Sequence, residues 1–142
     1  MNGGIISENI AGSSGGGIFI QATKLNSGFS TANIFSGQII NNTMSGEGYG
    51  NKKFGGGGIY VNGIKSRAGE KNGVLNLYNA VIKDNTAQES GGGYAACPVT
   101  LSSINVKKGV AIYGNHATLS KDIDIESGLW GFGEHNGLSL IH

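Results

Sequence analysis

The sequence predicts an all-β protein: a right-handed parallel β-helix of about four coils, each built from three short strands. Two recurring blocks support this prediction. The first block has the pattern Ile-x-x-Asn-x-(Ala/Met), and its copies begin at Ile6, Ile39, Ile82 and Ile112. The second block is a glycine triplet that leads into a short apolar segment, and its clear copies begin at Gly15, Gly56 and Gly91. The last copy has decayed to residues 121–125.

The apolar segments that follow the glycine triplets have the pattern of strands. In the first copy, Ile18 and Ile20 flank Phe19, and the second copy repeats this order as Ile-Tyr-Val at residues 59–61. Alternation with a period of two places the aliphatic residues together on one face of a strand. A further strand is expected before each later copy of the first block. Those strands are expected around Ile34, Leu75 and Leu77, and Ile104 and Val106.

One asparagine recurs in every copy of the first block. These residues are Asn9, Asn42, Asn85 and Asn115, so the repeat is roughly 30 to 43 residues long, as in solenoid proteins. Strands in neighbouring coils lie about 4.8 Å apart. At that spacing an asparagine at an inward corner can donate to and accept from its neighbours in the adjacent coils. We therefore expect these four side chains to form one hydrogen-bonded ladder.

The repeats occupy residues 1–126, and residues 127–142 depart from the pattern. This tail is rich in large apolar residues, and we expect it to fold over the last coil as a cap. The first repeat begins without a comparable segment before it. We therefore expect the N-terminal coil to continue into further coils or to pair with another chain, including a second copy of this one.

Together the two blocks resemble the repeat of polymorphic outer membrane proteins, which carries Gly-Gly-x-Ile and Phe-x-x-Asn signatures. The likeness extends from Gly4 to about residue 125, with isoleucine in place of phenylalanine three positions before each asparagine. It implies an extracellular or cell-surface location and a structural or adhesive role. The partners that this likeness implies are surface glycans or another cell-surface protein. Other parallel β-helices are polysaccharide lyases or hydrolases, so the likeness leaves a carbohydrate-active module as the alternative.

Composition argues against two classes of partner. The formal net charge is +1, and only 13% of the residues are charged, so no basic surface for nucleic acid is expected. No apolar run reaches the length of about 18 residues that a membrane-spanning helix needs. A single cysteine, Cys97, excludes an intrachain disulfide and a thiolate-rich metal centre.

The strongest acidic cluster consists of Asp122, Asp124 and Glu126. If the isoleucines between them point inward, these carboxylates point outward together, which makes them a candidate Ca²⁺ site. Polysaccharide-cleaving β-helices need carboxylates from neighbouring coils as well, and the aligned residues one coil earlier are Gly93, Ala95 and Cys97. We therefore predict no catalytic residues and no required cofactor.

A binding surface is a second candidate site. Phe19 and Tyr60 occupy the same outward position in neighbouring coils. Two exposed rings at that spacing could stack on a sugar. The alternative is an aromatic pair that is covered by another part of the chain.

Overall fold

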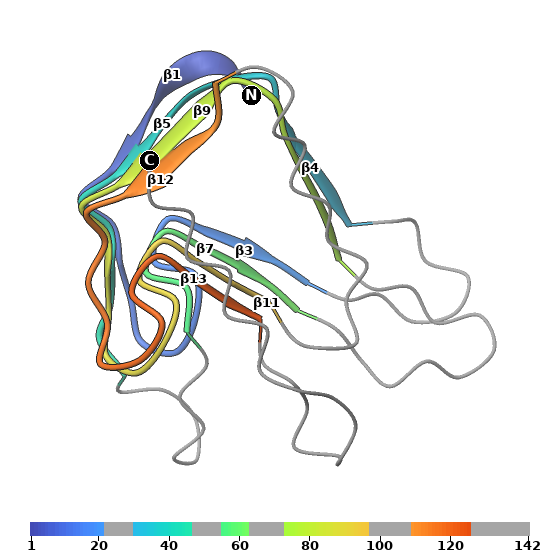
Figure 1. The fold of residues 1–142 in the computed structure, drawn as a ribbon. Coiled ribbons are helices and arrows are strands. Elements are labelled where there is room, and N and C mark those ends of the chain that lie inside the picture. Colours follow the sequence, from blue (N-terminus) through green and yellow to red (C-terminus); the bar gives the residue numbers. More distant parts are fainter. Residues whose placement is uncertain (22–29, 47–54, 63–72, 97–108, 126–142) are drawn as a thin grey trace, which may run out of the picture.

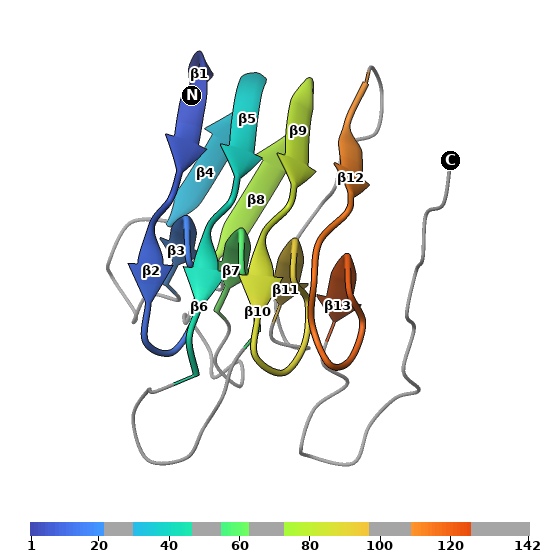
Figure 2. The ribbon, with the colours of Figure 1, turned by 90° about the vertical axis from the view of Figure 1, so that its left-hand side faces the viewer.

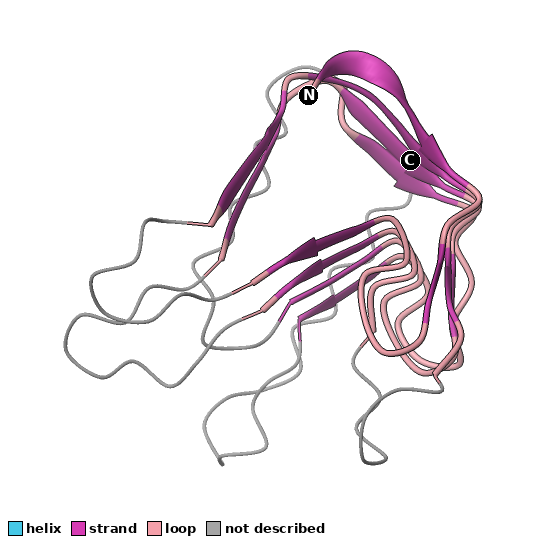
Figure 3. Cartoon of the chain, turned by 180° about the vertical axis from the view of Figure 1, so that it is seen from behind, coloured by secondary structure: helices cyan, strands magenta, loops and turns pink. Residues whose placement is uncertain are grey.

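The computed structural model describes residues 1–21, 30–46, 55–62, 73–96 and 109–125, and all of its regular structure is β-strand (Figures 1 and 3). None of these segments is a helix long and apolar enough to cross a membrane. The strand expected around Ile104 and Val106 and the expected cap at 127–142 lie outside the described residues.

The described strands form four sheets, and all of the pairing is parallel. The first sheet contains β1 (Asn2–Ser7), β5 (Ser36–Ile40), β9 (Ala80–Lys83) and β12 (Ala111–Tyr113). The second contains β2 (Ile10–Ala11), β6 (Thr43–Met44) and β10 (Thr86–Ala87). The third contains β3 (Ile18–Ile20), β7 (Ile59–Val61), β11 (Tyr94–Ala96) and β13 (Ile123–Ile125). The fourth contains β4 (Thr31–Ile34) and β8 (Val74–Leu77).

Each sequence repeat contributes its strands to these sheets in the same order. Figure 2 shows the corresponding strands of successive repeats side by side, with β1, β5, β9 and β12 in one row. In the third sheet, Phe19 pairs with Tyr60, Tyr60 with Ala95, and Ala95 with Asp124. This is the register that alignment of the glycine triplets predicts.

A complete repeat has four strands, where the sequence led us to expect three. The first block is the cause, because it contains two strands and not one. In the second repeat, β5 ends at Ile40 and β6 begins at Thr43, and the two belong to different sheets. Between them Asn41 has a left-handed backbone, with φ at 56°. Such a residue turns the chain sharply and ends the strand.

The same corner recurs in every repeat, directly before the ladder asparagine. The residues there are Glu8, Asn41, Asp84 and Gly114, with φ angles of 60°, 56°, 55° and 66°. Glycine, asparagine and aspartate adopt the left-handed region more readily than other residues. Glu8 is therefore the one residue in this column that is poorly suited to its backbone.

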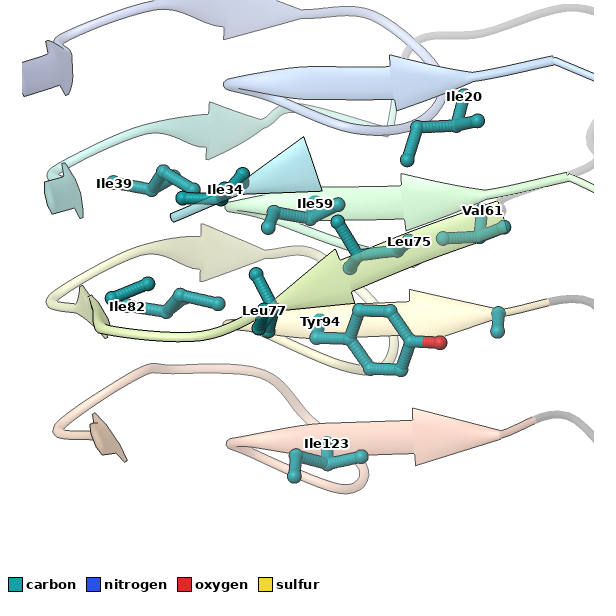
Figure 4. Packing of buried hydrophobic residues seen from close by; sticks show 12 residues of the cluster. Ile20, Ile34, Ile39, Ile59, Val61, Leu75, Leu77, Ile82, Tyr94 and Ile123 are labelled. Carbon is teal, nitrogen blue, oxygen red and sulfur yellow. The ribbon is translucent and has the colours of Figure 1, made fainter. Parts of the chain in front are cut away.

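The core lies between the first, third and fourth sheets (Figures 1 and 4). Ile39 and Ile82, which stand three positions before the ladder asparagines, are fully buried. They face Ile34, Leu75 and Leu77 from the fourth sheet, and the inward residues of the third sheet close the cluster. Burial of one such side chain contributes about 1.5–3 kcal/mol, and successive repeats supply the same column again.

The glycine triplets bring successive repeats close together. Gly56 has φ at 82°, a conformation that a side chain disfavours. A Cβ atom added to Gly58 would lie 2.5 Å from the carbonyl oxygen of Gly93 and 3.0 Å from Nδ2 of Asn85. The triplet therefore packs against both the next repeat and the ladder asparagine, and a larger residue at Gly58 would push them apart.

Candidate functional site

The four recurring asparagines form a continuous row of amide hydrogen bonds where the chain passes from the first sheet toward the second. Nδ2 of Asn9 donates to Oδ1 of Asn42 over 2.9 Å. Nδ2 of Asn42 donates to Oδ1 of Asn85 over 2.9 Å, and Nδ2 of Asn85 to Oδ1 of Asn115 over 3.0 Å. We call this row the asparagine ladder. It joins all four repeats through side-chain hydrogen bonds, in addition to the main-chain hydrogen bonds between the repeats.

The buried members of the ladder have their polar groups satisfied. The main-chain N–H of Asn42 donates to the same Oδ1 of Asn85 over 2.9 Å, so that oxygen accepts two bonds. Nδ2 of Asn85 also donates to the carbonyl oxygen of Ile39 over 2.9 Å. A buried amide without partners costs about 1–3 kcal/mol. These bonds remove that cost and fix the register of neighbouring repeats.

The ladder has a direction. Every amide donates toward the next repeat and accepts from the previous one, so donors point toward the C-terminal end. The last asparagine, Asn115, donates from its main-chain N–H and from Nδ2 to Oδ1 of Asp122, over 3.2 and 3.0 Å. Aligned amide dipoles leave a partial positive charge at their donor end, as at a helix N-terminus. A carboxylate there makes charge-assisted bonds, so Asp122 terminates the ladder.

The acidic cluster is thereby divided. Asp122 turns at least one carboxylate oxygen toward Asn115, where we expected it to point outward as a Ca²⁺ ligand. Asp124 lies in β13 opposite Ala95, and Glu126 lies outside the described residues. No group of three or more acidic, histidine or cysteine side chains in the described segments is arranged to hold a metal ion.

The predicted aromatic pair is present, but it is not an open platform. The rings of Phe19 and Tyr60 are stacked, with centroids 5.7 Å apart and planes inclined by 11°. Phe19 is 47% exposed, whereas Tyr60 is only 1% exposed. The expectation that both rings face solvent is therefore corrected, because Tyr60 lies on a central strand and is covered. Each ring also turns one face toward the other, which leaves less aromatic surface for a sugar.

A second aromatic pair, which we did not predict, lies beside the fourth sheet. The rings of Phe35 and Tyr78 stack with centroids 4.9 Å apart, and Phe35 is 50% exposed. Two residues before each ring lies an asparagine, and Nδ2 of Asn76 donates to Oδ1 of Asn33 over 2.8 Å, near the surface. The repeated tripeptides Asn-Ile-Phe at 33–35 and Asn-Leu-Tyr at 76–78 are the sequence signal for this pair of contacts.

Comparisons with known proteins identify no relative. No protein-family model, no curated protein and no solved structure matches the chain.

Proposed function

We propose that this chain is a segment of right-handed parallel β-helix that serves a structural, adhesive role in a cell-surface or secreted protein of the polymorphic outer membrane protein type. The observation that carries the proposal is the asparagine ladder, which runs through all four repeats and ends on Asp122. A row of this kind stabilises repeated stacking and leaves the outer faces free to vary. That division suits a long, stiff protein that presents surfaces at a distance from the cell.

A structural role agrees better with the chemistry of the chain than a catalytic role. Cleavage of a polysaccharide needs carboxylates that converge on the substrate. The best acidic candidate, Asp122, is engaged by Asn115 through two hydrogen bonds. Its neighbours in the same column, Gly58 and Gly93, carry no functional group. We therefore assign Asp122 to the fold and not to a reaction.

The test of this role combines location and activity. Antibodies against the chain should label intact cells of the organism that carries the gene, and beads coated with the protein should adhere to cell or matrix surfaces. Incubation with a panel of polysaccharides, with and without Ca²⁺, should release no products. Labelling only after the cells are permeabilised would overturn the location, and new reducing ends or unsaturated products would overturn the non-catalytic role.

Carbohydrate binding without cleavage is the second candidate, and the outer face of the fourth sheet favours it. Phe35 offers an exposed ring, and the hydrogen-bonded amides of Asn33 and Asn76 lie two residues before Phe35 and Tyr78 in the sequence. Aromatic faces and amides are the groups that proteins use to hold sugars. On a glycan array, Phe35→Ala should lose binding that Phe19→Ala retains. Equal loss in both variants, or no glycan bound at all, would remove this candidate.

A further inference from the structure

The N-terminal end of the asparagine ladder is an open acceptor site. Asn9 is exposed, and none of the described residues donates a hydrogen bond to its Oδ1. The equivalent oxygen of Asn42 accepts two bonds, from the main-chain N–H and Nδ2 of Asn9, over 3.2 and 2.9 Å. Asn9 Oδ1 therefore has the position of an internal ladder oxygen but lacks, within the described residues, the two N–H donors that such an oxygen has.

The main chain beside Asn9 completes the same pattern. In each later repeat, the residue after the ladder asparagine donates its N–H to the carbonyl oxygen of the previous asparagine. Thr43 donates to Asn9 in this way over 2.8 Å, and Thr86 donates to Asn42 over 2.8 Å. Ile10 pairs with Thr43 and occupies the equivalent position in the first repeat. By this register its N–H faces the side of β2 that no described strand covers.

These groups specify the residue that fits. Asn9 Oδ1 can accept from two N–H donors of one incoming residue, one on its main chain and one on a short side chain. The N–H of Ile10 can donate to the carbonyl oxygen of that same incoming residue. Asparagine supplies all three. Aspartate would supply a carboxylate where a donor is needed, and glutamine is one methylene longer.

The side chains at this end favour a covering strand. Ile5 is 61% exposed and Ile10 is 77% exposed, and their partners in the second repeat are the polar residues Gln38 and Thr43. Earlier in β1, Gly3 and Gly4 have φ angles of 115° and 93°, and the pairing with β5 is irregular between Asn2 and Ile5. Figure 1 shows β1 arching there. A straight edge is available only from Ile5 onward.

We infer that the N-terminal face, formed by residues 5–11, docks an extended peptide segment that runs parallel to β1 and β2 and carries the Ile-x-x-Asn pattern. This inference rests on the proposed β-helix and names its partner. Main-chain pairing supplies affinity in such strand addition, and the asparagine supplies specificity.

A second copy of the whole chain is a poor occupant of this face. Two N-terminal faces that met about a two-fold axis would oppose one Asn9 Oδ1 to another, acceptor against acceptor. In a head-to-tail stack, the donors of Asn115 would already be bound to Asp122. The direction of the ladder thus disfavours the self-association that an open end would otherwise suggest.

Peptide titration tests the inference. The probe is a synthetic peptide with the sequence of residues 36–46, which contains a ladder asparagine (Asn42) and the corner residue before it (Asn41). Followed by NMR at peptide concentrations up to millimolar, it should bind the intact chain saturably and shift the resonances of Ile5, Asn9 and Ile10. The peptide with Asn42→Asp should bind about tenfold more weakly or less, whereas the charge-matched Asn41→Asp peptide should bind as the parent does.

Variants of the protein supply the reciprocal control. Asn9→Leu should weaken peptide binding about tenfold. Asn9→Asp keeps an acceptor oxygen for the peptide but loses the Nδ2 donor to Asn42, so it should weaken binding less than Asn9→Leu does. No saturable binding, equal binding of the Asn42→Asp peptide, or dimerisation of the chain that Asn9→Leu abolishes would overturn the inference. Surface labelling and the polysaccharide panel do not depend on these results, so they separate its failure from failure of the proposed function.

Discussion

Two sets of asparagine side chains, a buried row and an exposed pair, make the same amide hydrogen bond in different surroundings. In the ladder, Nδ2 of Asn42 donates to Oδ1 of Asn85 over 2.9 Å, and both side chains are fully buried. On the fourth sheet, Nδ2 of Asn76 donates to Oδ1 of Asn33 over 2.8 Å near solvent. The distances are alike, so burial decides what each bond contributes. A surface amide that loses its partner can form a hydrogen bond to water instead, whereas a buried amide cannot.

The two rows also differ in extent. The ladder passes through four repeats and ends on a carboxylate, so the loss of an internal member removes hydrogen bonds from both of its neighbours. The surface pair joins two repeats on an outer face, where the sequence can change without such a loss. This contrast explains how the chain can keep one corner constant while its outer faces differ from repeat to repeat.

Removing one member from each row should give the largest difference. Asn85→Ala deletes the oxygen that accepts two bonds from Asn42 and the donor to Asn115. The free energy of unfolding should fall by about 3 kcal/mol or more. Asn33→Ala should lower it by less than about 0.5 kcal/mol. The midpoints of urea denaturation measure both changes, and equal losses would refute the argument that burial separates the two rows.

The glycine that packs against the ladder should be nearly as sensitive to substitution. An alanine at Gly58 would place Cβ 2.5 Å from the carbonyl oxygen of Gly93 and 3.0 Å from Asn85 Nδ2. Since one of these neighbours is backbone, Gly58→Ala should cost about 2–3 kcal/mol. Gly12 has no atom within 4 Å of an added Cβ. Gly12→Ala should therefore leave the urea midpoint unchanged or raise it slightly. A harmless Gly58→Ala would show that the repeats are packed less closely than described.

The sequence predicted the repeating parts of this structure because repetition shows in composition and spacing. The ladder asparagines and the pairing of Phe19 with Tyr60 follow from alignment of the blocks alone. What alignment misses is conformation inside a block. The left-handed corner at Asn41 splits one expected strand into β5 and β6, and only the backbone angles reveal it.

The end of the ladder and the exposure of the aromatic residues also could not be predicted from the sequence. Asp122 aligns with Gly58 and Gly93, so its column gives no sign that its carboxylate reaches back to Asn115 over seven residues. Tyr60 occupies an outward position by alternation, yet it is buried. Alternation assigns a side chain to one face of a strand, but whether that face meets water depends on what packs over it.

Neutralising the end of the ladder should have an intermediate effect. Asp122→Ala leaves the main-chain N–H of the buried Asn115 without its acceptor, whereas Nδ2 keeps the carbonyl oxygens of Ile82 and Tyr113. The loss should cost about 2 kcal/mol. Asp122→Asn retains an acceptor oxygen but loses the charge, and should cost about 1 kcal/mol. The control is Asp84→Asn, which makes the same change in an ion pair with Lys83 whose side chains are 34% and 45% exposed. That control should shift the urea midpoint little. If Asp122→Asn behaves like the control, the charge does not contribute to capping.

The smallest effect should come from the backbone corner at which the ladder begins. Glu8 has φ at 60°, and the equivalent residue of the second repeat is Asn41. Asparagine tolerates this conformation better than glutamate, so Glu8→Asn should raise the free energy of unfolding by about 0.5–1 kcal/mol. Glu89→Asn makes the same replacement at an exposed residue outside the left-handed region and should bring no gain. Thermal melting of both variants can resolve a difference of this size. An equal gain in both would mean that loss of negative charge, and not relief at the corner, is the cause. A gain confined to Glu8→Asn would show that the ladder depends on its corners as well as on its amides.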